Sequence, residues 1–300
     1  MIKDVLGICP GITAVIGSGG KTSLIRRLAW EICRDTTNVV SPVAIVCTTT
    51  HIMRPDDMPV YEAKPRIWAG PQTFAGQQGA EFDLSSEPDS SSEPDSSSEP
   101  DSRAGMYSSA GGQLLPEEGS RLETPDIGRI TAFVEENAGK PICIGMTDLK
   151  NPEKLVSFPI DMIERAAGKN AYILVEADGA KHLPLKAHND REPVIPDGCE
   201  RVILVIGAEG FGKTVAEAVH RPGIFAELAQ TGTDAAVTCE LLARVLKAER
   251  YKFGDCRLQI FVNGRSCEAA AGYAEELAGY TGWEVCAGCA KTGEAVKCGY

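Results

Sequence analysis

Residues 17–23 combine the residue types that bind polyphosphates: glycines, a lysine and hydroxyl side chains at the start of an expected helix. The glycines would form a turn without obstructing side chains, and the helix would direct its first N–H groups and its dipole at negative charge. Lys21 would reach the β- and γ-phosphates, and the Thr22 hydroxyl would contact a bridging magnesium ion. The sequence therefore predicts that a nucleoside triphosphate, ATP or GTP, binds with Mg²⁺. The residues expected to contact the nucleotide are Gly17, Ser18, Gly19, Gly20, Lys21, Thr22 and Ser23.

This glycine loop is shorter than the usual phosphate-binding pattern, since Val15 stands where the pattern has its first glycine. A tight glycine turn between a strand and a helix can also be purely structural. Apolar residues recur at helical spacing from position 24 to position 32, so a helix should follow Lys21, as phosphate binding requires.

A second segment, residues 207–214, matches the formal pattern better and ends in Lys213 and Thr214. Its chemistry is less suitable, because Glu209 places a carboxylate inside the anion site and Pro222 stops any helix about two turns after Lys213. We interpret this segment as a substrate-side or structural loop, with phosphate contacts as the minor alternative.

Two carboxylates stand at the end of the apolar run 172–175. Glu176 and Asp178 are two positions apart, so both can face the same side if the strand continues. Together with Lys21 they are the expected catalytic residues, and together with Thr22 they are the expected metal ligands, one group holding the metal and another activating water. The alternative is an ordinary solvated strand end.

Hydroxyl and basic side chains follow two of the expected strands and are the predicted substrate contacts. The threonine run 48–50 could also simply continue its strand, since threonine is β-branched. Lys186 and Arg191 belong to a proline-rich loop that could bind an anionic second substrate. The predicted substrate-binding residues are Thr49, Thr50, His51, Lys181, His182 and Lys186.

Three further features leave alternatives open. Asn263 ends an apolar run where a nucleotide base could be read, but Asn-Gly is also an ordinary turn, which we favour slightly. Cys286 and Cys289 have metal-ligand spacing with Cys298 nearby, yet a second such pair is missing, so unremarkable thiols are favoured. All four histidines fall in loops after expected strands, which is weak evidence for a metal site.

The elements that must position these residues alternate between apolar strands and helices. Such alternation predicts an α/β fold, a three-layer, mostly parallel sheet, with ligands at the carboxyl ends of the strands. The expected strands are 12–16, 43–47, 141–146, 172–175, 202–206, 258–262 and 283–286. The expected helices are 21–33, 127–136, 162–167, 224–230, 239–249 and 267–277.

Composition limits the functional classes. The 300 residues, 43% of them hydrophobic, can bury a large core, and we expect one domain over 1–300. A net charge of −12 argues against nucleic acid or an anionic membrane as a partner. The N-terminus lacks the long apolar stretch of a signal peptide, so a cytoplasmic protein with reduced thiols is expected from its eleven cysteines.

Residues 85–102 are three copies of the hexapeptide Ser-Ser-Glu-Pro-Asp-Ser, which contains no side chain that could join a core. We expect a disordered acidic insert there, within a flexible low-complexity region from about 72 to 125. Repeat expansion in a surface loop is favoured over a regulatory or docking role.

The sequence resembles the YqeC family, which is associated with maturation of selenium-dependent molybdenum hydroxylases. The matching motifs span most of the chain outside the insert, and they are residues 17–23, 48–51, 175–181 with 184–186, 192–196, and 220–225. The resemblance implies a P-loop NTPase fold, phosphate binding by Lys21, magnesium binding by Thr22, and metal or water contacts by Glu176 or Asp178. A molybdenum hydroxylase client or its cofactor precursor is the implied partner.

Three functions are compatible with these residues. The first is a nucleotide-hydrolysing maturation factor. The second is an ATP-dependent ligase or transferase acting on an anionic cofactor precursor, because the short loop and the threonine run also resemble Mur-type ligases. The third is a nucleotide-gated chaperone without significant catalysis. The sequence favours neither ATP nor GTP and gives no indication of oligomeric state.

Overall fold

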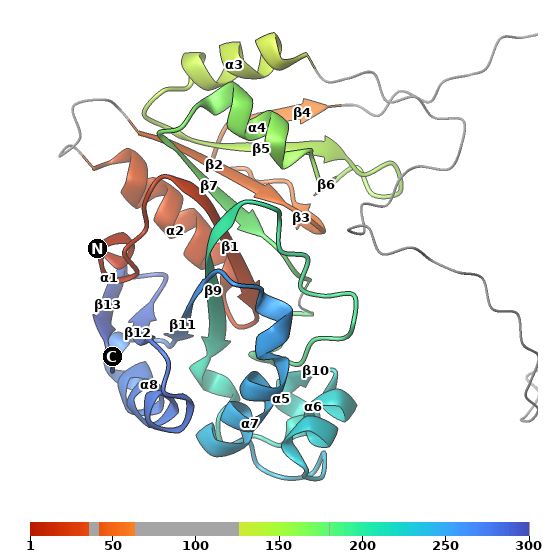
Figure 1. The fold of residues 1–300 in the computed structure, drawn as a ribbon, viewed down its shortest axis with the longest axis vertical. Coiled ribbons are helices and arrows are strands. Elements are labelled where there is room, and N and C mark those ends of the chain that lie inside the picture. Colours follow the sequence, from red (N-terminus) through yellow and green to blue (C-terminus); the bar gives the residue numbers. More distant parts are fainter. Residues whose placement is uncertain (36–41, 64–125, 180, 300) are drawn as a thin grey trace, which may run out of the picture. The chain divides into compact units, whose positions relative to one another are not determined.

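The centre of the fold is a parallel sheet of apolar strands, seen here in a computed structural model of the chain (Figure 1). β1 (Gly11–Gly17) pairs in parallel with β7 (Ala171–Glu176) on one side and with β9 (Cys199–Gly207) on the other. Every residue of β7 is buried, as is typical of parallel strands covered on both faces. The carboxyl ends of these strands therefore meet at one edge of the sheet.

The sheet has eleven strands in the described part of the chain, in the order β13-β12-β11-β9-β1-β7-β2-β5-β6-β3, with β4 paired to β5. It is mixed but mostly parallel, since the antiparallel pairs involve β13, β6 and β3 toward its two ends. β8 (Leu185–Lys186) and β10 (Val219–His220) form a separate small ladder. The other strands are β2 (Val43–Thr48), β3 (His51–Met53), β4 (Val60–Ala63), β5 (Pro141–Thr147), β6 (Lys154–Val156), β11 (Arg257–Asn263), β12 (Val285–Cys289) and β13 (Glu294–Lys297).

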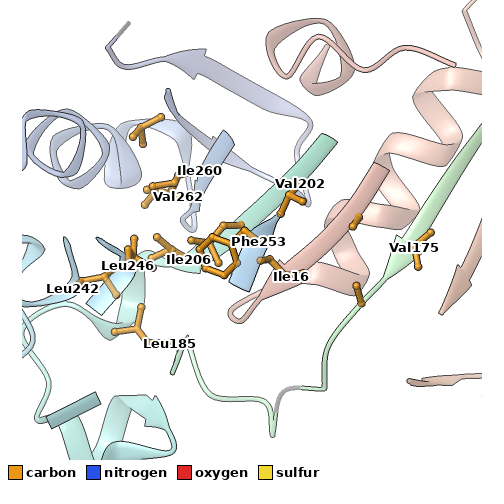
Figure 2. Packing of buried hydrophobic residues seen from close by; sticks show 14 of the residues in the cluster. Ile16, Val175, Leu185, Val202, Ile206, Leu242, Leu246, Phe253, Ile260 and Val262 are labelled. Carbon is orange, nitrogen blue, oxygen red and sulfur yellow. The ribbon is translucent and has the colours of Figure 1, made fainter. Parts of the chain in front are cut away.

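Helices cover both faces of the sheet, so its strands alternate between two apolar clusters. Val15 packs with Leu24 and Leu28 of α2, whereas Ile16 belongs to the cluster under the helices of the other face. Figure 2 shows this second cluster, in which Phe253 lies among the strand side chains. The helices are α1 (Ile2–Val5), α2 (Lys21–Cys33), α3 (Ile127–Glu136), α4 (Ile160–Ala167), α5 (Val215–Ala218), α6 (Pro222–Ala229), α7 (Cys239–Glu249) and α8 (Cys267–Thr281), with short 3-10 turns η1 (Ala208–Gly210) and η2 (Arg250–Phe253).

The structure describes residues 1–35, 42–63, 126–179 and 181–299. The elements above belong to one unit, Met1–Pro65 with Thr124–Tyr300. The expected acidic insert at 85–102 and the whole region 72–125 lie outside the described residues. Within the described ranges, no helix has the length and apolar character needed to span a bilayer.

The predicted α/β class with a mostly parallel sheet is confirmed, and the predicted central strands and helices lie close to their expected positions. The last predicted strand, 283–286, is shifted: Trp283 precedes the strand, which runs from Val285 to Cys289. Helix α4 begins two residues earlier than expected, after Pro159. Short elements such as β3, β8 and β10 were not predicted, because two or three residues carry no readable periodicity.

Candidate functional site

The glycine loop connects the buried strand β1 to helix α2 and lies against the ends of neighbouring strands. Gly17, Gly19 and Gly20 have φ angles of 89°, 83° and 126°, which favour glycine. A Cβ atom on Gly19 would lie 2.4 Å from Cα of Gly207, and one on Gly20 would lie 2.3 Å from Nδ2 of Asn263. Close packing against the ends of β9 and β11 therefore requires these glycines.

The N-terminus of α2 has no side-chain cap. Gly20 is the N-cap, and the first turn of the helix contains no acidic residue. Two loop amides already have protein acceptors, because the Gly17 N–H donates to Asp178 Oδ2 (2.8 Å) and the Ser18 N–H to the Val205 carbonyl (2.9 Å). An added anion would therefore use N–H groups from Gly19 onward.

Lys21 is buried and faces both predicted carboxylates. Its Nζ lies 2.9 Å from Asp178 Oδ1 and 4.0 Å from Glu176 Oε1, and it donates to the Gly17 carbonyl (2.8 Å). The parallel register explains this convergence: Glu176 is paired with Val15, so Asp178 reaches the level of Gly17. Two strand ends and one helix start thus place a cation between two anions.

Glu176 also contacts hydroxyl groups on both sides. The exposed Thr22 hydroxyl donates to Glu176 Oε2 (3.2 Å), and the buried Thr48 hydroxyl donates to the Glu176 carbonyl (2.8 Å). Thr22 and the Glu176 carboxylate therefore face the same point beside Lys21. A hydroxyl and a carboxylate are ligands that magnesium prefers.

Asp178 is fully buried and is the centre of a charged cluster. Besides Lys21 it contacts Lys186 Nζ (3.1 Å) and His188 Nε2 (2.9 Å), both through Oδ2. Its Oδ1 makes the ion pair with Lys21 but has no hydrogen-bond partner among the described residues. Asp178 thus connects the glycine loop to the segment that follows β7.

The environment shifts the pKa values of the two carboxylates in opposite directions. Burial raises the pKa of Glu176, and the charge of Lys21 only partly opposes this. Burial would also raise the pKa of Asp178, but the hydrogen bond from His188 and the charges of Lys21 and Lys186 outweigh it and hold that pKa well below its usual range. Divergent pKa values in a carboxylate pair are typical of groups with different roles.

A second layer of buried charge, which the sequence reasoning missed, holds Asp178 in place. His188 Nδ1 lies 2.8 Å from Glu249 Oε2, at the end of α7, and the His188 N–H donates to Glu249 Oε1 (2.6 Å). Lys186 Nζ also pairs with Glu192 (2.6 Å), which accepts a further hydrogen bond from Arg221 (2.9 Å). The loop position of His188 was noted from the sequence, but nothing in the local sequence indicates Glu249, because its partner is 61 residues away.

The predicted substrate-binding residues occupy different environments. The Thr49 hydroxyl donates to the Val194 carbonyl (2.8 Å), and the Thr50 hydroxyl lies 3.3 Å from that of Thr48. His51 is exposed on β3, with Nε2 at 3.7 Å from Asp148. Lys181 and His182 are exposed beyond the end of β7. Lys186 differs from them, because its buried ammonium is committed to Asp178, Glu192 and the Gly179 carbonyl.

The rival segment 207–214 has structural contacts. The Gly207 N–H donates to the Pro184 carbonyl (2.9 Å), and Glu209 pairs with Arg265 on the surface (2.7 Å). Thr214 caps α5 in a capping box with Glu217. In this arrangement Thr214 serves a four-residue helix.

The cysteines are all free thiols, eleven in number. Cys286 and Cys289 lie in β12 and Cys298 follows β13, all three buried. Burial raises the pKa of the Cys286 thiol to about 11. No cluster of three or more His, Cys, Asp or Glu side chains that could hold a metal occurs in the described ranges. A magnesium ion at Glu176 and Thr22 would therefore need phosphate oxygens and waters to complete its shell.

Comparison with known proteins places the chain in a family. The sequence profile described as YqeC protein matches residues 13–90 and 114–223, which is more than half of the chain. The chain belongs to the YqeC family. A relative in Escherichia coli (strain K12), named Uncharacterized protein YqeC, is 36% identical over 111 residues, covering 35% of this chain and 43% of the relative. No solved structure matches.

The YqeC match contains the glycine loop, both carboxylates and most of the second layer of charge. It ends at residue 223, so Glu249 and Asn263 lie outside it. The separate alignment with the Escherichia coli relative covers 43% of that protein's length, and its name states no activity.

Proposed function

We propose that this YqeC protein binds a nucleoside triphosphate with Mg²⁺ at the glycine loop and hydrolyses it, within a P-loop NTPase-like α/β domain. The observation that carries the proposal is the position of Lys21. It begins the open helix α2 directly after a glycine turn and contacts carboxylates from the adjacent strand β7. Such a strand, loop, helix and acidic strand end is the arrangement that polyphosphate chemistry requires.

The residues present fit a nucleotide and its metal. The α2 N-terminus offers N–H groups and a dipole without a competing acidic side chain in its first turn. Thr22 and Glu176 would hold magnesium, which needs few protein ligands beside phosphate oxygens and waters. Asp178 Oδ1 pairs with Lys21 and has no hydrogen-bond partner among the described residues, so it would orient the attacking water.

The roles of the two carboxylates follow from their surroundings. Lys21, Lys186 and His188 keep Asp178 ionised. Asp178 would therefore position Lys21 and the groups around the metal. Glu176 has one ammonium at 4.0 Å and the Thr22 hydroxyl at 3.2 Å, so it would hold magnesium together with Thr22. Bound magnesium would supply charge neutralisation at the phosphates.

The biological setting we propose is maturation of selenium-dependent molybdenum hydroxylases or of their cofactor, on the strength of the family resemblance. The client enzyme or an anionic cofactor precursor would approach from the side of Thr49, Thr50, His51, Lys181 and His182. Lys186 is less suited to contact a substrate directly, because its charge is already used inside the protein.

The experiment compares two lysines that follow glycine loops. Binding of ATP and GTP, with and without MgCl₂, is measured by calorimetry for the wild type, Lys21→Ala and Lys213→Ala. A lost charge-assisted contact weakens binding by roughly tenfold to 150-fold, so the nucleotide affinity of Lys21→Ala should be lower than that of the wild type by at least about tenfold. Lys213→Ala should bind like the wild type, because its segment has structural contacts only.

Equal binding by the wild type and Lys21→Ala, or equal losses in both variants, would refute the nucleotide site. Because Lys21 is buried, Thr22→Ala serves as a second variant: Thr22 is exposed, so its loss should leave the melting temperature unchanged and remove the magnesium dependence of binding. Glu176→Gln should lower hydrolysis by roughly a hundredfold while nucleotide still binds.

The same measurements separate the other functions. A ligase or transferase would show hydrolysis that depends on an anionic cofactor precursor. A nucleotide-gated chaperone would retain nucleotide-dependent association with its client in Glu176→Gln.

A further inference from the structure

A groove of 330 Å³ runs beside the glycine loop along helix α2. One wall is a stripe of the helix, and the other is the turn after β12. Along the helix, the stripe rises about 16 Å from its first to its last residue. The lining residues are Ser23, Arg27, Trp30, Arg34, Ala290 and Lys291.

Hydrogen bonds fix the two walls to each other and to the glycine loop. The Asn263 amide donates to the Gly19 carbonyl (2.8 Å) and accepts from the Ala290 N–H (3.0 Å). Arg27 donates through Nε to the Ala290 carbonyl (3.2 Å) and through Nη2 to that of Lys291. These bonds hold one wall of the groove against the loop, and Ser23 belongs both to the segment 17–23 and to the lining of the groove.

The chemistry of the lining is positive and aromatic. Arg27, Arg34 and Lys291 supply cations, and the residues that line the groove include no carboxylate. The Arg34 guanidinium lies 5.2 Å from the centre of the Trp30 ring. An aromatic surface with adjacent cations suits a flat base attached to a phosphate chain, because bases stack on indole rings and phosphate attracts the cations.

We propose that this groove holds the ribose and base of the nucleotide whose phosphates lie on the glycine loop. Ser23 lies beside the ribose and the base stacks on Trp30 next to Lys291, while Arg27 holds the two walls together. Asn263 is a positioning residue, since it holds the turn of Ala290 against the loop. The inference rests on the proposed function, and it gives the site a nucleoside pocket that a phosphate cradle alone does not have.

The experiment uses inorganic tripolyphosphate to separate the groove from the loop. Binding of ATP, GTP and tripolyphosphate with Mg²⁺ is measured for the wild type, Trp30→Ala, Trp30→Phe and Lys291→Ala. Arg26→Ala is the matched control, because Arg26 is a half-buried basic residue of the same helix that pairs with Asp56 and Asp57 instead of lining the groove.

Trp30→Ala should weaken nucleotide binding by about fivefold to 150-fold, the range for loss of one base stack, and leave tripolyphosphate binding unchanged. Trp30→Phe should retain most of the affinity, Lys291→Ala should lose part of it, and Arg26→Ala should match the wild type. If the nucleotide affinity of Trp30→Ala is within twofold of the wild type, or if nucleotide and tripolyphosphate lose affinity equally, the proposal that the groove holds the nucleoside is overturned. If the wild type binds tripolyphosphate as tightly as nucleotides, the loop site stands and the groove inference fails. If it binds neither, both proposals fail.

Discussion

Replacing His188 by alanine should destabilise the protein strongly, because the imidazole joins two buried carboxylates. Asp178 and Glu249 are 0% and 1% exposed, and the ring nitrogens lie 2.9 Å and 2.8 Å from them. Asp178 would keep Lys21 and Lys186, whereas within the described part of the chain the Glu249 carboxylate would keep only the hydrogen bond from the backbone N–H of residue 188. A buried charge left without its partner costs about 3–5 kcal/mol.

The free energy of unfolding is measured by urea denaturation for the wild type and His188→Ala. His51→Ala is the control, since His51 is exposed and its carboxylate partner lies at 3.7 Å, so its loss should change stability by less than about 0.5 kcal/mol. Glu249→Gln in the His188→Ala background should recover stability, because it removes the stranded charge. A loss below about 1 kcal/mol in His188→Ala, or additive effects within about 0.5 kcal/mol in the double variant, would refute the reasoning.

The pH dependence gives an independent check on the same contact. Burial lowers the pKa of His188, but hydrogen bonds to Asp178 and Glu249 outweigh it and raise the pKa above the ordinary 6.5. A raised pKa in the folded state means that this stabilisation is complete below pH 6.5 and is lost as pH rises through the folded value. The stability difference between wild type and His188→Ala should therefore be largest in mildly acidic buffer below pH 6.5 and shrink as the pH rises.

Two further predictions concern the loop and its neighbours. Gly19→Ala should lower the free energy of unfolding by about 1–3 kcal/mol or more, because Gly19 has a positive φ and an added Cβ would lie 2.4 Å from Cα of Gly207. Gly272→Ala in α8 should raise it by about 0.4–1 kcal/mol, because there is open space around the added Cβ. Thermal unfolding of both variants checks this. Lys186→Met should weaken nucleotide binding roughly tenfold in calorimetry, although the Lys186 ammonium is buried. Lys181 is exposed, so the control variant Lys181→Met should bind nucleotide like the wild type. Equal effects in the two variants would contradict the internal role of Lys186.

The sequence was sufficient to predict the central sheet, because buried parallel strands appear as continuous apolar runs such as those of β1 and β7. It also indicated where Glu176 and Asp178 would lie, since carboxyl ends of parallel strands share one edge. The functions of these residues stay predictions. Glu249 could not be found in this way, because a helix end far along the chain shows no local sign of the histidine it contacts.

Lys186 shows a different limit of sequence reasoning. Its position after a strand end predicts contact with an anionic substrate, and the protein does place it beside anions, but these are Asp178 and Glu192. A sequence shows the charge of a side chain and not which buried partner it meets. Asn263 is similar: the sequence placed it at the end of an apolar run, whereas its hydrogen bonds to two other loops depend on the order of β9, β11 and β12 in the sheet.

The second layer of charge explains how Lys21 could bind phosphate from a buried position. In the structure its ammonium pairs with Asp178, and turning toward a phosphate would weaken that pair. Stranding a buried carboxylate would be costly. Asp178 would keep Lys186 at 3.1 Å and His188 at 2.9 Å, and Glu249 holds His188 in place from the other side. Because these partners remain, Lys21 could exchange Asp178 for phosphate while the Asp178 carboxylate stays paired through Oδ2. Residues that never contact the nucleotide would thus set how readily the loop accepts it.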